Sequence, residues 1–179
     1  MKKTLLLLGI LLMLMVPTVA LAEGEQSTAT PTAQATPAPT AKPRTTLTPE
    51  EKTLRAEMVT SRQALRTLQT QANALTQENK TLGAQVRAGL QTVKDGTKTP
   101  SSPERIEELL ASLKQLRESL KATDGQVKEK MQAARTSIAA KDFAAAKTSI
   151  DGAITVLESR IALKQQVNTA LKELAGLLG

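Results

Sequence analysis

Apolar side chains recur at alternating steps of four and three residues from Leu54 to Val93. A step averaging about 3.5 residues keeps one face of a helix against a partner helix. The pattern therefore predicts a long helix with a packing seam along one side. The candidates for this seam, and for oligomerisation through it, are Leu54, Met58, Leu65, Leu68, Leu75, Asn79, Leu82 and Val86.

Helix-end signals bound the first helix at about residues 48–94. Thr48 is placed to cap its start, Pro49 suits the first helical position, and Glu51 completes the spacing of a capping box. Asp95-Gly96 is typical of a helix end.

Two further helices are expected, over about residues 102–140 and 142–178. Within the first of these, Asp124-Gly125 poses a choice between a continuous or kinked helix and a break. The heptad register carries over from Leu120 to Val127, which favours continuity at a cost of about 1 kcal/mol for the glycine. In the last helix, which Asp142 is placed to cap, the apolar step widens between Ile161 and Val167.

Similar helix lengths and short connections predict an all-α fold, either a long antiparallel three-helix bundle or a coiled coil. Asn79 lies at a seam position, where a buried Asn pair would fix the register of a parallel dimer. Glu57 and Arg62 have the spacing of an interchain ion pair in such a dimer. In a single-chain bundle, Asn79 would instead lie at the solvent edge. Both interpretations remain open from the sequence.

Residues 1–22 have the pattern of a secretory signal peptide. Two lysines precede an apolar run from Leu5 to Val16, and Ala20 and Ala22 supply the small residues that a signal peptidase reads, so Glu23 would begin the exported chain. The alternative is an uncleaved membrane anchor. Residues 23–47 form a Thr/Ala/Pro-rich stretch with few large apolar side chains, which predicts a disordered linker before the helical domain of residues 48–179.

Composition excludes several kinds of chemistry. The chain has no Cys and no His, which removes thiol nucleophiles, disulfides and the usual transition-metal ligands. Phe143 is the single aromatic residue, so there is no platform for stacking nucleic-acid bases. The net charge of +7 is spread over 24 basic and 17 acidic residues without a basic run, as on an ordinary solvated helix surface.

These features predict an exported, non-enzymatic protein that acts by contact, as a structural or adaptor element of the cell envelope or extracellular space. We expect it in the periplasm, on the cell wall or outside the cell. Its partner would be a protein, another copy of itself included, and not a nucleic acid or a small-molecule substrate. No cofactor or metal is expected, and membrane contact only through an uncleaved signal. The alternative is a periplasmic holdase chaperone that binds unfolded clients with its helices.

Overall fold

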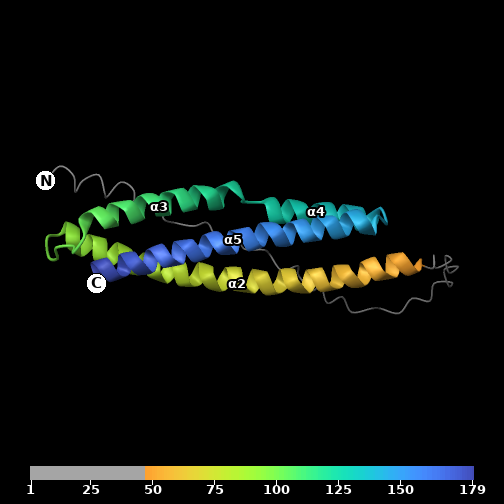
Figure 1. Ribbon diagram of the computed structural model, residues 1–179, viewed down its shortest axis with the longest axis horizontal. Coiled ribbons are helices and arrows are strands. Elements are labelled where there is room, and N and C mark those ends of the chain that lie inside the picture. Colours follow the sequence, from red (N-terminus) through yellow and green to blue (C-terminus); the bar gives the residue numbers. More distant parts are fainter. Residues whose placement is uncertain (1–46) are drawn as a thin grey trace, which may run out of the picture.

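The computed structural model describes residues 47–179 and contains only helices in that range. These are α2 (Pro49–Lys94), α3 (Pro103–Ala122), α4 (Gln126–Ala139) and α5 (Phe143–Leu178). They pack into an elongated, bundle-like fold (Figure 1), as the all-helical prediction requires. The expected signal peptide, with Ala20 and Ala22, and the expected linker lie outside the described residues, except for Leu47.

The start of α2 is fixed by the capping box that the sequence predicts. The Thr48 backbone N–H donates to the Glu51 carboxylate over 2.7 Å, and the Glu51 N–H donates to the Thr48 hydroxyl over 3.2 Å. These two bonds satisfy amide groups that have no partner within the helix. The helix ends at Asp95, so its bounds agree with the helix expected over residues 48–94.

Helices α2 and α5 run in the same direction, and α3 and α4 run opposite to both (Figure 1). Contacts between α2 and α5 advance in step along the two helices, from Ser61–Asp151 to Asn79–Asn168. Near the end of α5, a Cβ atom added to Gly89 would lie 2.8 Å from Leu178 Cβ, so the backbones approach closely there. Helix α5 packs against each of the other three helices, whereas α2 makes few backbone contacts with α3 or α4.

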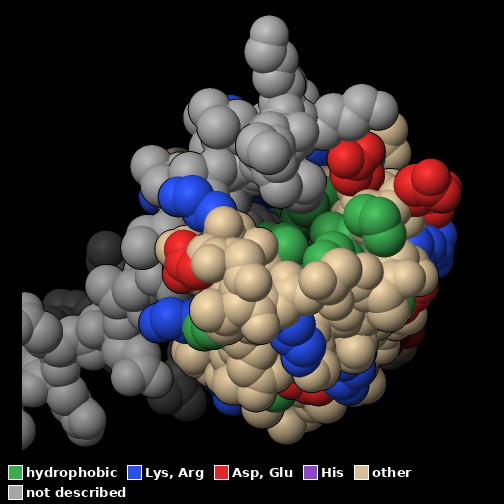
Figure 2. All heavy atoms as spheres, turned by 90° about the vertical axis from the view of Figure 1, so that its left-hand side faces the viewer, with side chains coloured by type: hydrophobic (Ala, Val, Ile, Leu, Met, Phe, Trp, Pro, Cys, Tyr) green, Lys and Arg blue, Asp and Glu red, His purple; other side chains and the backbone are tan. Residues whose placement is uncertain are grey.

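The two ends of the fold are packed with side chains of different size. At the end where α4 turns into α5, small residues such as Ala134 and Ala146 join Met58 and Phe143 in the core, and the helices approach closely. At the other end the core is built mainly from leucine, and α3 lies further from α5. Figure 2 looks onto this second end, where hydrophobic side chains gather in a hollow.

The helix expected over residues 102–140 is divided into α3 and α4, so the expectation of continuity through Gly125 was wrong. Gly125 adopts a φ of 83°, in the left-handed region, and no helix can pass through it. Heptad register did not reveal the break because it reports only which side chains face the core. Leu120 and Val127 do lie on the inner side, each half-buried, on either side of the break.

Gly125→Ala is expected to lower the free energy of unfolding by about 1 kcal/mol, because a side chain disfavours the left-handed region. Urea unfolding followed by circular dichroism measures this, since the chain has no Trp or Tyr for fluorescence. Lys141→Gly is the matched control, because Lys141 already holds a φ of 62°. It should leave stability unchanged or raise it by up to about 1 kcal/mol. A Gly125→Ala protein as stable as the parent would contradict the assignment.

Candidate functional site

The most distinctive arrangement in the described residues is a layer of polar side chains across the middle of the α2–α5 contact. Asn168 on α5 is only 7% exposed, and its side-chain amide donates to Asn79 Oδ1 over 2.8 Å. The Asn79 amide in turn donates to the Lys164 backbone carbonyl over 2.9 Å. Asn79 is therefore half-buried and bonded within the chain, and does not lie free at the solvent edge.

Lys164 carries a positive charge into this layer. Its ammonium group donates to the Ala72 carbonyl over 3.1 Å and to the Thr76 hydroxyl over 2.7 Å, both neutral acceptors on α2. Burial lowers the pKa of Lys164 below its ordinary value, the nearby Arg160 charge lowers it further, and Asp124 opposes both. The layer thus holds a cation whose hydrogen bonds are satisfied by oxygens without charge.

Arg160 connects α5 to the break between α3 and α4. Its guanidinium donates to the Leu120 carbonyl over 3.0 Å, to the Thr123 hydroxyl over 2.7 Å and to the Asp124 carboxylate over 2.8 Å. The Leu120 carbonyl belongs to the last turn of α3, where carbonyls lose their helical partners. Arg160 therefore caps the C-terminal end of α3, although it lies on α5, and it bonds the segment between α3 and α4 to α5.

Ion pairs at the edges of the α2–α5 contact join carboxylates of α2 to lysines of α5. Lys172 lies 2.8 Å from Glu78, and Lys147 lies 3.8 Å from Glu57. The hydrogen bond from Lys172 lowers the pKa of Glu78, and one from Asn168 adds to the effect. Because all four side chains are at least partly exposed, each pair adds little to stability. These pairs show how α2 is rotated about its axis, because they identify the flank of α2 that faces α5.

The predicted seam residues all lie on the inner side of α2. Met58 and Val86 are buried, and the others, Leu54, Leu65, Leu68, Leu75, Asn79 and Leu82, are half-buried. Sequence reasoning missed Arg160, Lys164 and Asn168. For Lys164 the available signal was the widened apolar step between Ile161 and Val167, within which it lies; Arg160 and Asn168 lie just outside that interval.

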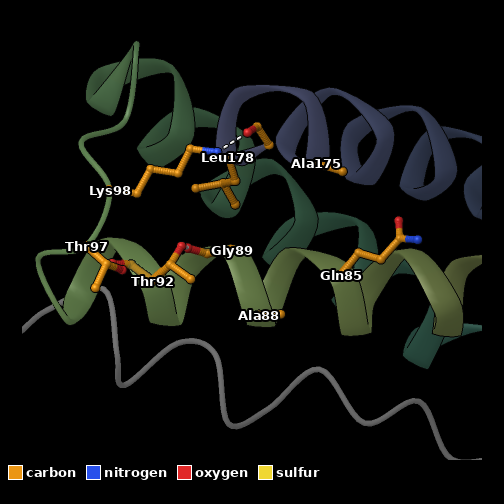
Figure 3. A pocket seen from close by; sticks show the side chains of 9 residues that line it. Gln85, Ala88, Gly89, Thr92, Thr97, Lys98, Ala175 and Leu178 are labelled. Atoms are coloured by element: carbon orange, nitrogen blue, oxygen red, sulfur yellow. Dashed lines mark hydrogen bonds between the residues drawn. The ribbon is translucent and has the colours of Figure 1, made fainter.

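A shallow pocket of about 460 Å³ lies between the ends of α2 and α5 (Figure 3). Lys98 reaches across it and donates to the backbone carbonyl of Gly179. The Thr92 and Thr97 hydroxyls both donate to backbone carbonyls of their own segment, over 2.7 Å and 2.8 Å. Among the described residues that line this pocket, none forms a pair of acid, base or nucleophile side chains.

Comparison of the chain with protein-family models, with curated proteins and with solved structures gave no match. Among residues 47–179, no group of side chains is arranged to hold a metal ion. No helix in that part of the chain combines the length and apolar character needed to cross a membrane. The distinctive features of the described residues are therefore the polar layer and the outer helix surfaces.

Asn79→Ala and Asn168→Ala should each lower the free energy of unfolding by about 1–2 kcal/mol, because each leaves the other amide without its buried partner. The double variant should lose less than the sum of the two, by about 0.5–1 kcal/mol. Urea unfolding of the four proteins of this cycle measures the coupling. Strictly additive losses would contradict a direct Asn79–Asn168 contact.

The free energy of unfolding should rise with pH in the window between the lowered pKa of Lys164 and its ordinary value of 10.5. In that window the unfolded chain binds the proton and the folded chain has released it, so higher pH favours folding. Lys164→Met keeps an apolar stem without the charge and should flatten the rise, measured by urea unfolding at about pH 7.5 and about pH 10.

Lys147→Met is the control for this pH effect. The hydrogen bond from Lys147 to Asp151 raises the pKa of Lys147, so the stability that it contributes is fully present below 10.5 and is lost only above that value. The variant should therefore keep the rise between the two pH values. Equal flattening by both substitutions would show that Lys164 is not the responsible group.

Proposed function

We propose that this chain is an exported, non-enzymatic protein that acts by contact, as a structural or adaptor element of the cell envelope or extracellular space. The observation that carries the proposal is the surface of α2. Among its 46 residues, α2 buries Met58, Ala72, Gly83 and Val86, and leaves a long outer face open. Val59 on this face is a large apolar side chain with 66% of its surface exposed.

Export is proposed from residues 1–22, whose lysine pair, apolar run and Ala20-Leu21-Ala22 end have the form of a cleaved signal peptide. The following Thr/Ala/Pro-rich stretch would then form the N-terminal segment of the exported chain, ahead of the helices. Export and cleavage are tested by expressing the full chain in the cells that make it, followed by cell fractionation and N-terminal sequencing. We expect Glu23 to be the first residue.

A single-chain, three-helix bundle is the architecture that we propose in preference to a zipper dimer. Both the amide nitrogen and the Oδ1 of Asn79 are engaged within its own chain, by the Lys164 carbonyl and by Asn168, as a single-chain bundle requires. Glu57 lies near Lys147 of the same chain, and Arg55 lies over the Phe143 ring, 4.4 Å from its centroid. Light scattering should therefore give the mass of one chain.

The contact function is tested by photo-crosslinking in the cells that make the protein. A benzophenone amino acid replaces Val59 in one variant and Ala111, an exposed residue of α3, in the other. We expect a discrete crosslinked product from position 59 and none from position 111. A smear of many products would favour the holdase alternative, and no product from either position would contradict a contact function.

A further inference from the structure

Two rows of basic side chains follow the helices at heptad spacing. Seven-residue steps keep side chains on one flank of a packed helix. Along α2 one such row has Val59 and Asn73 among its members, and along α3 and α4 the other is preceded by Glu107. The basic members of the first row are Lys52, Arg66, Lys80, Arg87 and Lys94, and those of the second are Lys114, Lys121, Lys128 and Arg135. All are exposed except Arg87, which is half-buried.

Ion pairs place both rows on the same side of the fold. Glu57 and Glu78, three heptads apart, lie close to lysines of α5, so their flank of α2 faces α5 and the basic row occupies the opposite flank. On α3, Arg105 pairs with Glu173 of α5 over 2.7 Å, which orients that helix in the same way. On α4, Lys130 lies against Gly152 of α5, so Lys128 and Arg135 lie on the flank away from α5. Both rows therefore border the strip where α2 faces α3 and α4, which we call the lateral seam.

The lateral seam is the side of the fold where contact runs through side chains, because those of α2 share core clusters with those of α3 and α4 while the backbones stay apart. Helix α2 makes few backbone contacts with α3 or α4, although all of them pack on α5. Gly83 is buried near the seam, yet a Cβ atom added to it would meet no heavy atom within 4 Å. The apolar side chains of the seam are half-buried and come from both borders; they are Leu65, Leu90, Leu120, Val127, Met131 and Ile138.

One basic side chain of the first row is itself partly enclosed by the protein. Arg87 Nε is enclosed by protein atoms and donates to no acceptor among residues 47–179. A second copy that met this strip with its own copy of the strip would bring like charges together, which is unfavourable. Carboxylates would instead pair with both rows, Arg87 included.

We infer that an acidic amphipathic helix of a protein partner lies along the lateral seam. Its apolar face would cover the half-buried side chains, and its carboxylates would face the two basic rows, as in other helix-in-groove complexes. This inference rests on the proposed contact function and names the class of partner.

Three synthetic peptides of equal length test the inference against the protein purified from cells that make the full chain. One is an amphipathic helix with Leu on its apolar face, Glu on both flanks and a single Trp. The second replaces each Glu by Lys, and the third scrambles the first so that no apolar face forms. The protein contains no Trp or Tyr, so the fluorescence anisotropy of the peptide Trp reports binding directly.

We expect the Glu peptide to bind at least ten-fold more tightly than the Lys and scrambled peptides, and to weaken with added salt. Binding of the scrambled peptide as tightly as the Glu peptide would show simple attraction of polyanions and overturn the inference. Equal binding by the Lys peptide, or no binding of the Glu peptide at low salt, would also overturn it. A dimer seen by light scattering that the Glu peptide dissociates would assign the seam to a second copy.

Charge reversal locates the binding surface. Arg66→Glu with Lys128→Glu changes one exposed residue of each row and should weaken the Glu peptide at least ten-fold. Lys42→Glu with Arg44→Glu changes the net charge equally without altering a described helix, and should have little effect. Circular dichroism checks that both variants keep their helices. If charge reversal unfolds the protein, Arg66→Gln with Lys128→Gln replaces it as the test variant, because it removes the same two charges without reversing them. Equal weakening by the control pair would overturn the assignment to the seam.

The peptide result and the crosslinking at Val59 separate the two proposals. A discrete crosslinked partner together with no preference for the Glu peptide would overturn the lateral-seam inference and leave the contact function standing. No crosslinked partner would contradict the contact function itself, whatever the peptides do.

Discussion

The cost of holding Lys164 between helices is the constraint around which the middle of this fold is arranged. A partly buried ammonium loses solvation and needs oxygen partners to replace it. The Ala72 carbonyl and the Thr76 hydroxyl supply them from α2, and the neighbouring Asn79–Asn168 pair continues the layer. These bonds fix the alignment of α2 with α5, because sliding one helix along the other would separate every donor in the layer from its acceptor.

Next to this layer, α5 also holds the break between α3 and α4. Arg160 lies one turn before Lys164 and takes the Leu120 carbonyl, the Thr123 hydroxyl and the Asp124 carboxylate, the groups that the end of α3 exposes. Helix α5 thus bonds α2 on one side and the α3–α4 break on the other. Because the carboxylates Glu57 and Glu78 of α2 lie toward α5, basic side chains dominate the flank that faces α3 and α4.

Features that depend on neighbouring residues could be predicted from the sequence, and features that depend on distant residues could not. The Thr48 and Asp142 caps and the seam of α2 follow from local spacing, and the structure has them. Asn79 is bonded to a residue 89 positions away, and no local pattern identifies that partner. Lys164 and Asn168 looked like an interruption of the apolar pattern of α5, whereas they form its polar centre. A helix continuing through Gly125 was predicted from the heptad register of Leu120 and Val127, but two helices separated by a break satisfy the same register.

The direction of the helices determines how far apart the two ends of the described chain lie. With α3 and α4 counted as one pass, the chain traverses the long axis three times, and an odd number of passes leaves its ends at opposite poles (Figure 1). The 46 residues of α2 alone extend for about 70 Å at about 1.5 Å per residue. The fold therefore keeps Leu47 and Gly179 apart by about the length of one long helix, at opposite poles of the described chain.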